Sequence, residues 1–134
     1  MGAWGADSFE NDDAADWLGD FCDKPDKTVI VSALSQISEM SADDYLEASD
    51  CCAGIAAAEI MAALKGSPNS NLSDEAKSCV SQLKFTVDQN LTILAVNAME
   101  RIRTNSELKE LWDESESPDE WYDAMGNLIE RLKR

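Results

Sequence analysis

Residues 54–64 constrain the fold more than any other part of this chain, because they are apolar on nearly every side of a helix. Alanine is the strongest helix former, and Glu59 is the only charged residue in this alanine-rich stretch. A helix that is apolar all round lies buried among other elements. Ser49 or Asp50 is the expected N-cap, and Gly66 is the expected end. We therefore expect this helix at the centre of a bundle.

Shorter apolar stripes at helical period precede and follow this segment, and no stretch is a convincing strand. In the first stripe, Trp17 lies at the edge and is expected to be part of the core. The other expected helices begin after Asn11, at Asp26 or Lys27, after Ser73, before Leu91, after Asn105 or Ser106, and after Ser117. We predict an all-α fold, a compact bundle of six or seven helices, with residues 1–134 as a single domain.

Two of these helices carry more detailed predictions. The last has the clearest start, because Ser117 and Glu120 match a capping box with Pro118 at the first helical position. The fourth follows Ser73, and its apolar stripe continues as far as Val87.

Acidic residues gather in two segments of the chain. Residues 1–26 hold eight carboxylates against one base, and residues 107–123 again hold eight against one, within a net charge of −16. Solubility requires less charge than this, and the excess repels itself in the compact state. Phosphate binding needs the opposite sign. We therefore expect a basic protein partner and no direct nucleic-acid ligand.

The partner-binding hypothesis takes carboxylates from both segments and expects the fold to bring them onto one continuous surface. They are Asp13, Asp16, Asp20, Glu110, Asp113, Glu114 and Glu116. Such a surface would steer and complement a cationic cleft. It favours a non-enzymatic acidic binding protein, either an immunity-type or a DNA-mimicking inhibitor of a basic toxin or nucleic-acid-binding enzyme.

Two other functions remain open at this point. Divalent cations bind several oxygens, so the N-terminal carboxylates could serve a cation-binding protein or a metal-dependent enzyme, although the calcium-loop pattern is absent. An acidic housekeeping domain without a charged partner would instead spread its acids evenly. Glu59 is a separate candidate, because a buried carboxylate needs a partner or a proton. We expect it to pair with a tryptophan N–H, with an arginine or with backbone.

The remaining chemistry of the chain argues against catalysis. It has no histidine, and no nucleophile and base stand at a catalytic spacing, so we predict no enzyme and no cofactor. The four cysteines, Cys22, Cys51, Cys52 and Cys79, are expected to be free thiols. Neither a basic leader followed by an apolar stretch nor an apolar run of about 20 residues occurs. We therefore expect a cytoplasmic chain that does not enter a membrane.

Several stretches together resemble domain-of-unknown-function family 4259, a bacterial family. They are residues 1–5, which read Met-Gly-Ala-Trp-Gly, then residues 9–17, 45–48 and 105–112, the alanine-rich helix with Glu59, and Trp121. The resemblance implies a small stand-alone bacterial protein and transfers no activity. Trp4, Asn11, Asp12, Glu59 and Trp112 belong to the family pattern, so Asn11 and Asp12 are interpreted as helix caps. Trp4 is expected to anchor the N-terminal segment.

Overall fold

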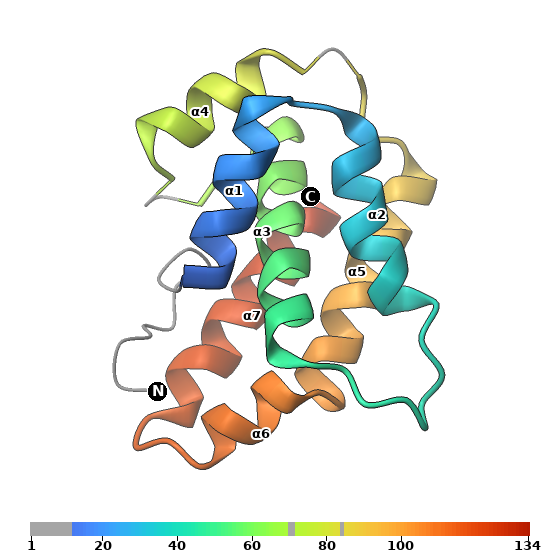
Figure 1. The fold of residues 1–134 in the computed structure, drawn as a ribbon, viewed down its shortest axis with the longest axis vertical. Coiled ribbons are helices and arrows are strands. Elements are labelled where there is room, and N and C mark those ends of the chain that lie inside the picture. Colours follow the sequence, from blue (N-terminus) through green and yellow to red (C-terminus); the bar gives the residue numbers. More distant parts are fainter. Residues whose placement is uncertain (1–11, 70–71, 84) are drawn as a thin grey trace.

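The computed structural model describes residues 12–69, 72–83 and 85–134, and within these ranges the regular elements are all helices (Figure 1). The helices are α1 (Asp12–Asp23), α2 (Lys27–Ser38), α3 (Ala48–Leu64), α4 (Asp74–Ser81), α5 (Gln89–Thr104), α6 (Glu107–Asp113) and α7 (Pro118–Lys133). No strand occurs in the described ranges. The predicted all-α bundle is confirmed.

Helix α3 is the centre of the bundle, as its composition predicts. It packs against each of the other six described helices, and its residues from Cys51 to Ala62 are buried with the exception of Ala53. Close packing explains Gly54, where an added Cβ would collide with the buried side chain of Ile37 on α2. The small residues of α3 therefore let α2 approach its backbone.

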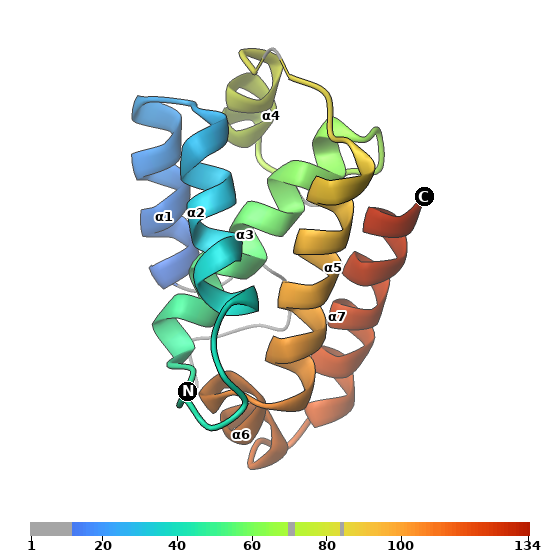
Figure 2. The ribbon, with the colours of Figure 1, turned by 90° about the vertical axis from the view of Figure 1, so that its right-hand side faces the viewer.

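The other helices surround α3 on all sides (Figures 1 and 2). Helices α1 and α2 cover one side, and α5 and α7 cover the other. Helix α4 lies across one end of the bundle, next to the C-terminal end of α1, while α6 lies at the opposite end. The described helices α1 and α6 therefore lie at different positions along the long axis of the bundle.

Side-chain caps set most of the helix starts. Asp26, Ser73, Asp88 and Ser106 each accept a hydrogen bond from a backbone N–H of the first turn that follows. These contacts confirm the predicted caps at Ser73 and Ser106. Ser117 does precede α7, but its side chain makes no capping hydrogen bond. The predicted capping box is therefore wrong in that detail.

Helix α3 begins earlier than predicted because its cap comes from another helix. Its first residue is Ala48, and the Ala48 N–H donates to Oε1 of Glu107 at 2.8 Å. In return, the Glu107 N–H donates to the carbonyl of Leu46 at 2.9 Å. A carboxylate 59 residues away thus replaces the cap expected at Ser49 or Asp50. This arrangement ties the start of α6 to the start of α3.

Helix α4 is shorter than its apolar stripe suggests. It ends at Ser81, although Leu83 and Val87 still pack against the core from the connector that follows. Apolar spacing therefore predicted burial correctly and helix length incorrectly. Of the helices in the described ranges, none combines the length and hydropathy that a membrane crossing requires.

The cysteine prediction is wrong for one pair. Cys22 at the end of α1 and Cys79 of α4 form a disulfide, with their Cα atoms 5.4 Å apart. Cys51 and Cys52 are free and buried, as expected. The bonded cysteines are 57 residues apart in sequence, and only the packing of α1 against α4 brings them within disulfide range.

Candidate binding surface between α1 and α2

An open groove runs between α1 and α2, which both pack on α3 but do not pack closely on each other. Its volume is about 360 Å³, and it is lined by Trp17, Thr28, Val29, Ser32, Ala33, Gln36 and Ala53. Ala53 is the one residue between Cys51 and Ala62 that α3 leaves partly exposed, which places it on the groove floor. We call this feature the α1–α2 groove.

The α1 wall of the groove combines an aromatic ring with an acidic rim. Trp17 is half-buried and stacks on Phe21, with ring centroids 5.2 Å apart and planes 5° from parallel. Asp13 and Asp20 stand four residues before and three residues after Trp17, so they share its face of the helix. Asp16 is exposed beside them.

No cation of the described residues forms an ion pair with the acidic rim. Helix α1 contains no basic residue between Asp12 and Asp23. The ion pairs among the described residues involve other helices, and none includes Asp13, Asp16 or Asp20. Asp16 and Asp20 are exposed to solvent, and Asp13 is half-buried.

The α2 wall is free of acidic residues. Thr28, Ser32 and Gln36 are exposed at successive turns, and Val29 and Ala33 lie half-buried behind them. Residues 27–38 include no aspartate or glutamate, which is unusual in a chain with a net charge of −16. A second hollow, of about 530 Å³, opens along α2 and is lined by Lys27, Thr28, Val31, Ser32, Ser35, Gln36 and Glu39.

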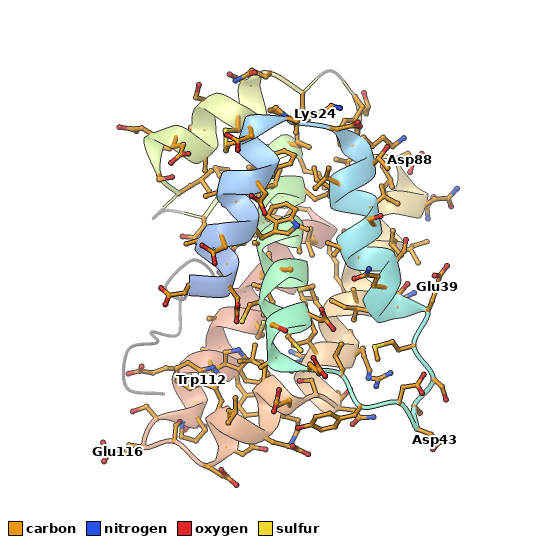
Figure 3. All side chains as sticks on the ribbon, in the orientation of Figure 1. Lys24, Glu39, Asp43, Asp88, Trp112 and Glu116 are labelled. Atoms are coloured by element: carbon orange, nitrogen blue, oxygen red, sulfur yellow. A yellow bond between two sulfur atoms is a disulfide. The ribbon has the colours of Figure 1, made fainter. Side chains whose placement is uncertain are left out.

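The acidic residues of the α6 region lie elsewhere. Helix α1 packs on α3 and α4, whereas α6 packs on α3, α5 and α7. In Figure 3, Glu116 lies at one end of the molecule, and Lys24, which follows the C-terminal end of α1, lies at the other. Helices α1 and α6 do not pack closely on each other, although Asp13 and Glu107 each act on a neighbouring thiol of α3, Cys52 and Cys51. That Asp13, Asp16 and Asp20 share one continuous surface with Glu110, Asp113, Glu114 and Glu116 stays a prediction.

Two members of the α6 group already have partners. Asp113 accepts hydrogen bonds from Nζ of Lys109 and from Oη of Tyr122, each at 2.7 Å, and these contacts lower the pKa of its carboxyl group. Oε2 of Glu110 accepts a longer one, of 3.4 Å, from Oη of Tyr45. Part of the α6 charge is thus used within the fold, which makes α1 the stronger candidate surface.

The cation-site alternative gains no support from the described residues. Among them, no group of three or more histidine, cysteine, aspartate or glutamate side chains is arranged to hold a metal ion. On α1, the carboxylates of Asp12, Asp16, Asp20 and Asp23 are exposed.

Comparison with known proteins identifies a family without an assigned activity. The model of the family described as "Domain of unknown function (DUF4259)" matches residues 2–124, which is most of the chain. The chain belongs to the DUF4259 family. No curated protein and no solved structure matches this DUF4259 chain.

Two of the five family-pattern positions have clear structural roles in this DUF4259 chain. Glu59 and Trp112 are both buried, on α3 and α6. Asp12 is the first residue of α1, where a carboxylate suits the positive end of the helix dipole. Trp4 and Asn11, for which an anchor and a cap were expected, lie outside the described residues.

Glu59 is fully buried and its partner is an arginine from α7. Nη1 and Nη2 of Arg131 donate to the two carboxylate oxygens of Glu59, at 2.7 and 3.2 Å. Nδ2 of Asn69 donates to Oε2 at 3.0 Å, and Nη1 of Arg131 also reaches the carbonyl of Ser67 at 3.3 Å. Oδ1 of Asn127 accepts from Nε of Arg131 at 2.7 Å. Of the partners expected for Glu59, the structure confirms arginine.

Sequence reasoning did not single out Arg131. It appeared there as one of several basic residues that suit the C-terminal end of the last helix. The available signal was its position three residues after buried Leu128, at the edge of the α7 stripe. The bidentate ion pair joins α3 to α7, and because each charge is used by the other, neither is free to bind a ligand.

Proposed function

We propose that this DUF4259 domain is a non-enzymatic binding protein that uses the outer face of α1 to bind a basic protein. The partner class that fits is a basic toxin or a nucleic-acid-binding enzyme. The domain would inhibit it by covering a cationic cleft, as an immunity-type protein or a DNA mimic does. A long-range acidic field would also speed the encounter.

The observation that carries this proposal is the row of unpaired carboxylates on α1. Asp12, Asp16, Asp20 and Asp23 are all exposed, and they fall within one side of the helix. The row is about 16 Å long, because each residue advances the helix by about 1.5 Å. Asp16 and Asp20 repel each other at a spacing of four residues, which costs the isolated domain stability. A basic partner would relieve the repulsion between these carboxylates on binding, and this relief would contribute to the binding free energy.

Further support comes from the side chains of this chain, which offer few of the groups that commonly act in catalysis. It contains no histidine. Burial raises the pKa of the free thiols Cys51 and Cys52 to about 12 each, so both stay protonated near neutral pH and are poor nucleophiles. Binding explains the exposed acids without requiring a reacting group.

A cytoplasmic location stays a prediction, and the Cys22–Cys79 disulfide weighs against it. Cytoplasmic thiol buffers keep most cysteines reduced, so disulfides are rare in that compartment. Alkylation of intact cells that express the chain tests the location. If Cys22 and Cys79 are both trapped as thiols, the chain resides in a reducing compartment, and if both are protected until a reductant is added, it does not.

The binding proposal is tested by affinity capture with matched charge reversals. The immobilised domain is exposed to soluble proteins of the source organism, and the retained proteins are eluted with rising salt. The double variant Asp16→Lys/Asp20→Lys removes the α1 row. The control Asp123→Lys/Glu130→Lys makes the same charge change on exposed residues of α7, across the bundle from α1.

We expect a basic protein to be retained by the wild type and the α7 control and lost by the α1 variant. Exposed charges contribute little to stability, so all three proteins should remain folded, as circular dichroism can verify. Retention that is equal for the α1 and α7 variants contradicts the proposal, and so does retention of acidic proteins alone.

A further inference from the structure

We propose that the α1–α2 groove receives an amphipathic helix of the basic partner. The apolar stripe of that helix would lie over Ala53, between Trp17 and Ala33, and its lysine or arginine side chains would lie beside Asp13, Asp16 and Asp20. This inference rests on the proposed function, and it adds the surface, the secondary structure of the ligand and its orientation.

The shape of the groove suits a helix better than a compact small molecule. Its α2 residues, Thr28, Ser32 and Gln36, recur every four positions, so this wall extends for about 12 Å along the helix axis. Three successive turns of an incoming helix present apolar side chains over a similar length. The groove is also open to solvent along that length, since Thr28, Ser32 and Gln36 are exposed.

The apolar residues of the groove are already in place. Ala53 is partly exposed in a helix that is otherwise buried along its middle, and its small side chain permits close approach of another backbone. Trp17 is held by its stack on Phe21, and Val29 and Ala33 belong to the face of α2 that packs toward the core. A partner would therefore order little of this surface on binding, which favours affinity.

Charge selects a basic partner over a second copy of this chain. A homodimer across the groove would bring two domains of net charge −16 together and place acidic rims close to each other. A basic helix instead meets Asp13, Asp16 and Asp20 on the α1 side only, because α2 offers hydroxyl and amide groups there. The cationic residues of the ligand should therefore flank its apolar stripe on one side.

The test uses a synthetic peptide as the probe. It is about 18 residues long, or about five helical turns, and contains leucine, alanine and lysine arranged as an apolar stripe with lysines on one flank. A second peptide has the same composition in an order without a stripe. Both carry a fluorophore, and binding to the full chain is followed by anisotropy. We expect saturable one-to-one binding, about tenfold tighter for the striped peptide.

Two matched pairs of variants locate the site. Ala33→Gln places a polar group in the groove without changing the charge, and Ala15→Gln does the same on the outward side of α1. Ser32→Lys blocks the groove mouth from an exposed position, and Asn97→Lys repeats that charge change at an exposed position on α5. Each groove variant should weaken the striped peptide about tenfold, and each control should change it by less than about twofold.

The outcomes separate this inference from the proposed function. Groove variants that bind as their controls do overturn the inference, and so does equal affinity for the two peptides. If Asp16→Asn/Asp20→Asn nevertheless weakens both peptides, the acidic face on α1 stands as proposed and only the groove is wrong. If that variant changes nothing either, both proposals fail. If Ala33→Gln does not fold, the Ser32→Lys and Asn97→Lys pair decides.

Discussion

Arg131 and Glu59 form the most heavily buried ion pair of the described residues. A buried ion pair is not in itself a large source of stability, because both charges lose their hydration. Its two parallel hydrogen bonds do demand one geometry, which fixes the rotation of α7 against α3. We infer that the pair specifies how these helices pack.

Removing one partner of this pair should be far more damaging than removing an exposed pair. We expect Arg131→Met to lower the free energy of unfolding by about 3–5 kcal/mol, because the fully buried carboxylate of Glu59 then loses the arginine that balances its charge. Glu59→Met/Arg131→Met should recover most of this loss. The control Arg103→Met breaks the partly exposed pair with Glu100 and should cost about 0–1 kcal/mol. Urea unfolding measures all three, and equal losses for Arg131→Met and Arg103→Met contradict the interpretation.

The buried thiols give the domain a pH dependence at the alkaline end. Burial raises the pKa of Cys51 and Cys52 from 9.0 to about 12. Between these values the unfolded chain releases thiol protons that the folded chain keeps, so rising pH favours unfolding. The contribution of each thiol is present below pH 9 and declines by about 1.4 kcal/mol per pH unit above it.

Comparison with a variant isolates this effect from other groups that titrate in the same range. Cys51→Ala/Cys52→Ala should show a shallower loss of stability than the wild type between pH 9 and pH 11, measured by chemical denaturation at each pH. Parallel profiles for the two proteins would show that the thiols are not the cause.

At the scale of single residues, burial was predictable and partners were not. The position of Glu59 inside an apolar helix was enough to predict that it would be buried and paired. Its partner is 72 residues away, and local spacing carries no information about which arginine α7 turns inward. The disulfide between Cys22 and Cys79 was missed for the same reason.

Among the elements, helix existence was easier to predict than helix ends. The apolar period located all the described helices, and Ser73 and Ser106 cap theirs as expected. The start of α3 was missed because Glu107 of α6 supplies its cap, which is a tertiary contact. The end of α4 was missed because connector residues can be buried without being helical.

The contact between α2 and α3 provides a prediction about packing. Gly54→Ala improves helix propensity by about 1 kcal/mol, but the added methyl group meets Cδ1 of Ile37. Ile37 is buried and cannot swing into solvent. We expect a net loss of about 1–3 kcal/mol from overpacking.

A double-mutant cycle tests this contact directly. Ile37→Val removes the colliding methyl group, so Gly54→Ala should be tolerated, or should stabilise the protein, in that background. The expected coupling energy is about 1–2 kcal/mol. Independent, additive effects of the two substitutions in thermal or urea unfolding would show that the helices separate instead of clashing.

For the whole molecule, the arrangement of charge was not predictable from its distribution along the chain. The two acidic segments are at opposite ends of the sequence, and a compact bundle could have placed them together. In the described ranges the two segments belong to helices that do not pack closely on each other: α1 packs on α3 and α4, while the Glu107 cap holds α6 at the start of α3. The groove also depends on packing, since it exists only because α1 and α2 share α3 as their support.

The balance between repulsion and pairing gives the last prediction, in which one type of substitution has opposite effects at two places. Asp16→Asn/Asp20→Asn removes carboxylates without ion-pair partners, so at about 0.01 M ionic strength it should stabilise the domain by a few tenths of a kcal/mol. Asp113→Asn removes the partner of Lys109 and should destabilise the domain by a similar amount.

Both changes in the free energy of unfolding should shrink at about 1 M salt, where the Debye length is about 3 Å. The wild type itself should gain stability over that range, because screening weakens the self-repulsion of its −16 net charge. Thermal unfolding across the salt series measures each trend. If the α1 variant is no more stable than the wild type at low salt, the acidic row carries no stability cost. The presence of the row in this chain would then need no binding partner to explain it.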